Sequence, residues 1–200
     1  MTIIYLHGLD GDPNANKAII TADHADTLGI TTIRPDLNCP PDEVVDKLLT
    51  LIKDNPDCVL IGSSLGGYFA TLLSDMTGVP CVLLNPSIRP DVSFRRFLND
   101  QFAGQMLPDE TVIYRTTGGW DIQYRDLAWF ENHRLTIKNP NKIKVLLKLG
   151  DELLDAHATQ NFYESHGAAV IAQAGGDHRM SDYAEQVVQV VAWADELASV

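Results

Sequence analysis

The segment Gly62-Ser63-Ser64-Leu65-Gly66 constrains the fold more than any other part of this 200-residue chain. It follows directly on the apolar run at residues 58–61 and fits the pattern G-x-S-x-G, in which a serine occupies a sharp turn between a strand and a helix. Glycines at both ends let neighbouring backbone pass where a Cβ atom would clash. The pattern therefore predicts a buried strand, a strained turn at Ser64 and a helix directly after it.

Short apolar runs alternate with segments of helical periodicity through most of the chain. Their continuous hydrophobicity is typical of strands that are buried on both faces. We expect strands at residues 3–6, 31–34, 58–61, 82–84, 143–149 and 168–172, and helices at residues 15–28, 42–53, 65–75, 154–165 and 181–198. The alternation predicts one domain, residues 1–200, with a mostly parallel sheet of about six strands between two layers of helices.

Residues 88–140 depart from this alternation and are rich in aromatic residues. They are expected to form a small helical insert, either a cap over the edge of the sheet or an excursion that its aromatics pack down, and the two descriptions are compatible. Trp120 and Tyr124 are candidates for lining a substrate pocket, although such aromatics more often belong to a core. Arg89 is a candidate for binding an anionic group of a substrate, or for neutralising a carboxylate within the insert.

The charge balance and the cysteines exclude several classes of function. A formal net charge of −12 argues against a nucleic-acid partner, because affinity for nucleic acids rests on clustered basic residues. The three cysteines have neither disulfide nor metal-ligand spacing, so no metal site is expected. Without a signal-peptide pattern or an apolar run of membrane-spanning length, the expectation is a cytoplasmic protein that does not insert into membranes. The oligomeric state stays open.

A serine hydroxyl is a weak nucleophile at neutral pH, so Ser64 needs a general base and a carboxylate that orients that base. Asp151 and His178 each follow a predicted strand, where open α/β sheets place their sites. The order Ser, Asp, His along the chain is that of the α/β-hydrolase arrangement. Asp155, four residues after Asp151, stays an alternative acid.

The end of the first predicted strand supplies a further element, the glycine-bearing loop His7-Gly8-Leu9-Asp10-Gly11. This loop can direct a backbone N–H at the serine. We expect the N–H groups of Leu9 and Leu65 to stabilise the negative oxygen of a tetrahedral intermediate. His7 is interpreted as a structural residue of the loop.

Several segments together resemble the YqiA/YcfP family of small bacterial esterases, within the α/β-hydrolase superfamily. They are His7-Gly8, residues 62–67, Asn85-Pro86-Ser87-Ile88-Arg89-Pro90, residues 150–155 and residues 175–178. The resemblance implies an α/β-hydrolase-type three-layer sandwich that hydrolyses short-chain acyl esters, with Ser64, Asp151 and His178 as the catalytic triad. The chain departs from the family at Asp177, where the family commonly has Asn, and matches the insert only loosely at residues 118–121.

The expected function is therefore that of a serine esterase that acts on a small-molecule acyl ester through an acyl-enzyme intermediate, without a cofactor. A thioesterase or another acyl hydrolase or acyltransferase of the same fold is an alternative, because the fold does not determine the leaving group. A binding protein that kept the scaffold without catalysis is a second alternative.

Overall fold

The computed structural model describes residues 1–98, 102 and 105–199. Its centre is a six-stranded sheet in the order β2-β1-β3-β4-β7-β8, in which every neighbouring pair is parallel. The strands are β1 (Thr2–Leu6), β2 (Thr31–Ile33), β3 (Cys58–Ser63), β4 (Cys81–Leu84), β7 (Ile143–Lys148) and β8 (Ala169–Gln173). The predicted parallel sheet is confirmed.

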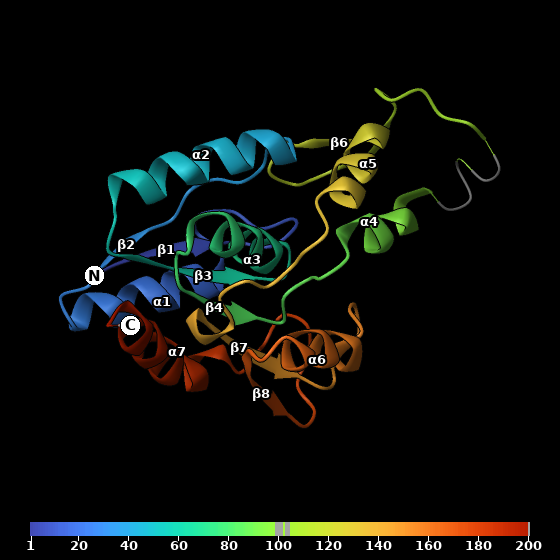
Figure 1. Ribbon diagram of the computed structural model, residues 1–200. Coiled ribbons are helices and arrows are strands. Elements are labelled where there is room, and N and C mark those ends of the chain that lie inside the picture. Colours follow the sequence, from blue (N-terminus) through green and yellow to red (C-terminus); the bar gives the residue numbers. More distant parts are fainter. Residues whose placement is uncertain (99–101, 103–104, 200) are drawn as a thin grey trace.

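Helices cover both faces of this sheet (Figure 1). Along β1, Ile3 and Tyr5 pack with helices α1 (Asn16–Thr27) and α7 (Tyr183–Ala198), whereas Ile4 and Leu6 pack on the opposite face. That second face carries α2 (Pro41–Asp54), α3 (Leu65–Thr77) and α6 (Ala156–Ser165). The arrangement is the predicted three-layer α/β sandwich. None of the helices in the described residues combines the length and the apolar character that a bilayer crossing requires.

The insert lies between β4 and β7 and contains more than helices. Its elements are α4 (Pro90–Ser93), the short 3-10 helix η1 (Phe94–Leu98), β5 (Val112–Arg115), β6 (Asp121–Gln123), α5 (Tyr124–Asn132) and the 3-10 turn η2 (Pro140–Lys142). β5 and β6 form an antiparallel hairpin that the sequence analysis did not expect. Gly119, with φ of 93°, supplies the left-handed turn conformation that lets the two short strands pair.

Aromatic residues attach the insert to the main core. Phe94 and Phe130 meet edge to face with ring centroids 5.4 Å apart, and Phe130 meets Tyr68 of α3 in the same way at 5.3 Å. Trp120 is 4% exposed and belongs to the same apolar cluster as the residues of α2 and α3. Because the insert shares its core with the sheet, we propose that residues 1–200 form one domain.

Arg89 belongs to an ion pair inside the insert. Its Nε and Nη2 donate hydrogen bonds of 2.8 and 2.7 Å to the two carboxylate oxygens of Asp91, whose side chain is 3% exposed. The hydrogen bonds from Arg89 lower the pKa of the Asp91 carboxyl against the opposing effect of burial. Of the two roles considered for Arg89, the structure shows neutralisation of a carboxylate within the insert.

We predict that Arg89→Gln lowers the free energy of unfolding by about 1–3 kcal/mol at neutral pH, because the buried Asp91 carboxylate loses its charged partner. The exposure of Arg89 keeps the effect below that of a fully buried pair. Since the pKa of Asp91 is lower in the folded state, this stabilisation is present above the unfolded pKa, about 3.9, and is lost as the pH falls through the folded value. Denaturant titrations at several pH values measure both effects.

Arg95→Gln is the matched control, because Arg95 pairs with Glu131 at 4.0 Å and both side chains are at least half exposed. The control is expected to change stability by less than about 0.5 kcal/mol. Equal losses in the two variants would contradict the role given to the Arg89–Asp91 pair.

Candidate active site

Ser64 lies in a strained turn between β3 and α3. Its φ of 54° and ψ of −118° are unusual for a residue with a side chain. A Cβ atom on Gly62 would lie 2.5 Å from the carbonyl oxygen of Gly66, and one on Gly66 would lie 2.1 Å from the carbonyl oxygen of Leu6. The two glycines of the pattern are therefore needed for the close approach of backbone around Ser64.

Ser64, His178 and Asp151 form a continuous chain of hydrogen bonds. His178 Nε2 is 2.9 Å from Ser64 Oγ, and His178 Nδ1 is 2.7 Å from Asp151 Oδ2. Because a carboxylate only accepts, Nδ1 carries the proton toward Asp151, and Nε2 of the neutral ring accepts from the serine hydroxyl. The three residues follow β3, β7 and β8, and the structure brings together all three that the sequence singled out.

Asp151 is held as a buried, ionised carboxylate. Burial raises its pKa, but the hydrogen bond from His178 and those from the backbone N–H groups of Leu154 and Leu153 outweigh this effect and lower it. The two backbone bonds to Oδ1 are 2.8 and 2.9 Å long. The alternative acid, Asp155, instead accepts from the N–H of Ala158 at the start of α6. Only Asp151 of the two is in contact with His178.

Leu9 and Leu65 line the same cavity as Ser64 and His178. Leu65 is the first residue of α3, where helix N–H groups lack intrahelical partners. Gly8 lies directly against the serine, since a Cβ atom added there would be 3.0 Å from Ser64 Cβ. Within the described residues, neither the Leu9 nor the Leu65 N–H donates to another backbone group. We propose these two N–H groups as the donors to an oxyanion beside the serine.

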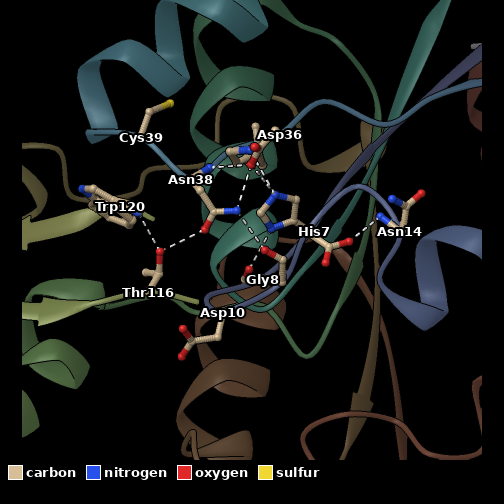
Figure 2. A network of polar contacts seen from close by, with 12 residues as sticks. His7, Gly8, Asp10, Asn14, Asp36, Asn38, Cys39, Thr116 and Trp120 are labelled. Carbon is tan, nitrogen blue, oxygen red and sulfur yellow. Dashed lines mark hydrogen bonds and ion pairs between the residues drawn. The ribbon is translucent and has the colours of Figure 1, made fainter. Parts of the chain in front are cut away.

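His7 uses both ring nitrogens to hold the loop that carries Leu9. Its Nδ1 donates to the carbonyl oxygen of Gly8 at 2.9 Å, and its Nε2 accepts from the N–H of Leu37 at 3.0 Å (Figure 2). The ring is 5% exposed. With both nitrogens occupied, His7 is a structural residue and has no nitrogen left to transfer a proton to a substrate.

The β5–β6 hairpin contacts the same loop through a polar network (Figure 2). Asn38 donates to the carbonyl oxygen of Gly11 at 3.0 Å and accepts from Thr116 Oγ1 at 3.1 Å. In the same loop, the carboxylate of Asp10 accepts from the hydroxyl of Tyr114 at 2.7 Å and from the N–H of Thr117 at 2.9 Å. The insert therefore supports the loop that presents Leu9.

The cavity beside Ser64 has a volume of about 520 Å³, within the usual size range of small-molecule sites. Its apolar lining comes from several parts of the chain: Leu9, Leu65, Phe94, Leu153, Leu154 and Met180. Lys17, Arg96 and Arg179 also line it. Burial lowers the pKa of Lys17 to about 8, and its ammonium donates to the carbonyl oxygen of Arg179.

Arg89, Trp120 and Tyr124 do not line this cavity, which corrects the expectation that they belong to a substrate pocket. Arg89 pairs with Asp91, Trp120 is buried in the core, and Tyr124 begins α5. Aromatic residue type alone does not distinguish a pocket wall from a core. No sequence pattern marked Phe94, Arg179 and Met180 as lining residues, because only the folded chain brings them close to the serine.

The cysteines lie away from this site. Burial raises the pKa of Cys58 to about 11 and that of Cys81 to about 12, so both are neutral thiols at physiological pH. Burial also raises the pKa of Cys39. In the part of the chain that the structure describes, no three His, Cys, Asp or Glu side chains gather in a way that would hold a metal ion.

Comparison with solved structures identifies the fold. A protein of the α/β hydrolase superfamily from Xanthomonas campestris pv. campestris is 22% identical, with a TM-score of 0.65, over 100% of this chain and 99% of that chain. Est1E from Butyrivibrio proteoclasticus is 15% identical, with a TM-score of 0.78, over 100% of this chain and 88% of that chain. At these identities the likeness shows the α/β-hydrolase fold.

Comparison of sequences identifies the family. The sequence model described as "Uncharacterised protein family (UPF0227)" matches residues 2–195. UPF0227 proteins of Vibrio vulnificus (strain CMCP6) and Shewanella woodyi (strain ATCC 51908 / MS32) are 25% identical over 178 residues and 27% identical over 173 residues. Both alignments cover 81% of this chain and 84% of the relative. The chain thus belongs to the UPF0227 family, the YqiA/YcfP-like group.

Proposed function

We propose that this protein is a serine esterase that hydrolyses small acyl esters through an acyl-enzyme intermediate. The observation that supports this most directly is the chain of hydrogen bonds from Ser64 through His178 to Asp151, at 2.9 and 2.7 Å. Ser64 and His178 line a cavity of small-molecule size, together with Leu9 and Leu65, whose backbone N–H groups are not bonded to other backbone groups in the described residues.

The first half of the proposed reaction forms the acyl-enzyme. His178 Nε2 takes the proton of Ser64 Oγ as this oxygen bonds to the ester carbonyl carbon, and the carbonyl electron pair moves onto its oxygen. The N–H groups of Leu9 and Leu65 stabilise that oxyanion. When the intermediate collapses, the bond to the alcohol oxygen breaks and His178 protonates the leaving alcohol. Asp151 stabilises the imidazolium throughout.

The second half releases the acid. A water molecule gives its proton to His178 Nε2 as its oxygen attacks the acyl-enzyme carbonyl. Collapse of the second tetrahedral intermediate breaks the bond between the acyl carbon and Ser64 Oγ and releases the carboxylic acid, while His178 returns the proton to Ser64 Oγ. Every proton that moves is carried by His178, so the reaction needs no cofactor.

Thioesters and acyl acceptors other than water would use the same groups, and thioesterase or acyltransferase activity remains the principal alternative. A binding protein on this scaffold is the other alternative. A solved structure of the same fold is that of the esterase domain of a Rhodothermus marinus protein, and Est1E from Butyrivibrio proteoclasticus has been solved with ferulic acid bound. Because that likeness is one of fold, the proposal rests on the geometry around Ser64.

We predict that Ser64→Ala lowers kcat for p-nitrophenyl acetate by at least about 10³-fold and abolishes labelling by a fluorophosphonate probe, because the nucleophile is lost. Ser74→Ala is the control: Ser74 is a buried serine of the same helix α3, outside the cavity lining. Unchanged turnover in Ser64→Ala would overturn the proposed function. A wild-type protein that the fluorophosphonate probe does not label would favour the binding protein, because the enzyme proposal requires an activated Ser64.

We also predict that Asp151→Asn lowers kcat by about 10⁴-fold, because the amide no longer fixes the ring tautomer or stabilises the imidazolium. Asp155→Asn is a matched control in the same loop. Asparagine also caps helices well, so the Asp155→Asn protein should keep helix α6 intact and should keep its esterase activity. Steady-state kinetics on both variants decide between the two acids, and the opposite ranking would assign the role to Asp155.

A series of p-nitrophenyl esters from acetyl to palmitoyl tests the acyl preference. We expect kcat/KM to be highest for short chains and at least about 10-fold lower for palmitoyl, because a cavity of this size encloses only a small ligand. Parallel assays on acetyl-CoA and butyryl-CoA measure thioester cleavage. A kcat/KM for the thioesters well above that for the matching esters would replace the esterase proposal with a thioesterase.

A further inference from the structure

Asn85 follows β4, the strand between the one that carries Ser64 and the one that carries Asp151. Its side chain is buried, with 2% of the residue exposed, and its φ is 41°. Its backbone N–H donates to the carbonyl oxygen of Leu146 in β7 at 3.0 Å. Asn85 does not line the cavity. It therefore lies behind the site and has no direct access to a substrate.

The side-chain amide of Asn85 connects the loops of the base and the acid. Its Nδ2 donates to the carbonyl oxygens of Asp177 and His178, both at 3.1 Å. Its Oδ1 accepts from the N–H of Lys148, the last residue of β7, at 2.8 Å. Both amide hydrogens and the amide oxygen are thus used, and they link the backbone of His178 to the strand that leads to Asp151.

The same segment also contacts the turn that carries the nucleophile. The N–H of Ser87 donates to the carbonyl oxygen of Ser64 at 3.0 Å, and the N–H of Ser64 donates to the carbonyl oxygen of Leu84 at 3.0 Å. Residues 84–87 are therefore hydrogen-bonded to the loops of all three reacting side chains. This is part of the Asn-Pro segment that the sequence analysis singled out without giving it a role.

Other hydrogen bonds also hold the His178 loop, among them one from the N–H of Gly150 to the carbonyl oxygen of Gly175 at 2.9 Å. The N–H of His178 donates to Glu152 Oε2 at 2.9 Å, an exposed contact, and the carbonyl oxygen of Asp177 also accepts from the N–H of Met180 at 3.1 Å. For the carbonyl oxygen of His178, Asn85 is the partner that the described residues supply. Loss of the Asn85 amide would leave this carbonyl oxygen without that partner, and would remove one constraint on the backbone that positions the His178 ring.

We propose that Asn85 is a positioning residue that holds the His178 ring between Ser64 and Asp151. The inference rests on the proposed function, in which this ring carries the proton. Asparagine suits the position because it tolerates a positive φ and offers two donors and an acceptor in one short side chain. A ring displaced by about 1 Å loses proton transfer to Ser64 while the cavity stays unchanged, so the effect is expected in kcat and not in KM.

Two variants of Asn85 separate its contact with Lys148 from its contacts with Asp177 and His178. Asn85→Asp keeps the shape and the acceptor for the Lys148 N–H but places an oxygen against the two carbonyl oxygens. Asn85→Gly removes the whole side chain and keeps the positive φ accessible, so it remains usable where the aspartate variant does not fold. Thr71→Val is the control. It removes the buried hydrogen bonds that Thr71 of α3 makes with the carbonyl oxygen of Gly67 and with the hydroxyl of Tyr163 of α6, both at 2.8 Å, and Thr71 does not line the cavity.

We expect both Asn85 variants to lower kcat for p-nitrophenyl acetate by about 10–100-fold with KM changed less than about 3-fold, by analogy with lost outer-shell hydrogen bonds in enzyme sites. Thr71→Val should lower the denaturation midpoint with kcat kept. One-dimensional proton NMR provides a readout independent of turnover. The downfield signal of the proton between His178 Nδ1 and Asp151 should shift or broaden in the Asn85 variants alone.

If the Asn85 variants keep the wild-type kcat, as Thr71→Val is expected to do, and their downfield NMR signal is unchanged, the role of Asn85 is overturned. That failure is distinct from failure of the proposed function, which would appear as equal turnover in the wild-type protein and Ser64→Ala. If the wild-type protein has no esterase turnover, the NMR signal alone tests whether Asn85 holds the ring.

Discussion

The structure depends on a turn that the side chain of Ser64 itself disfavours. A non-glycine residue at a φ of 54° persists only where its surroundings hold it. The Ser64 N–H is bound by the end of β4, and its carbonyl oxygen accepts from Gly67 at 2.9 Å, from Tyr68 at 3.2 Å and from Ser87 at 3.0 Å. The stable sheet and the first turn of α3 thus offset a local strain, and the strain presents the hydroxyl to the cavity.

The parallel arrangement of the sheet explains why a few short loops suffice for the whole site. β3, β4, β7 and β8 are consecutive in the sheet and run in the same direction, so the residues that follow them meet at one edge. Ser64, Asn85 and Asp151 each lie one to three residues beyond their strands, whereas His178 lies five beyond β8. This longer loop is hydrogen-bonded through its backbone to the Asn85 amide.

The insert contributes to the site from outside the sheet. Its hairpin is hydrogen-bonded to Asp10, while Phe94 and Arg96 of η1 line the cavity. Aromatic packing of Phe94 and Phe130 on Tyr68 fixes the position of these elements relative to α3. The two roles considered for the insert are therefore compatible: the aromatics pack it down, and the packed insert forms part of the wall and supports the loop of Leu9.

The sequence by itself predicted the sheet, its two helical layers, the turn at Ser64 and the meeting of Ser64 with His178 and an acid that follows β7. These follow from local patterns: apolar runs, helical periodicity, glycine spacing and the order of Ser64, Asp151 and His178 along the chain. Only the tertiary structure decided which aromatics belong to the core, that Arg89 pairs with Asp91, that Asp151 and not Asp155 contacts His178, and that Asn85 joins the loops. Each of these features depends on contacts between distant segments or on the direction of a side chain. The spacing of residues along one segment specifies neither the contacts nor the directions.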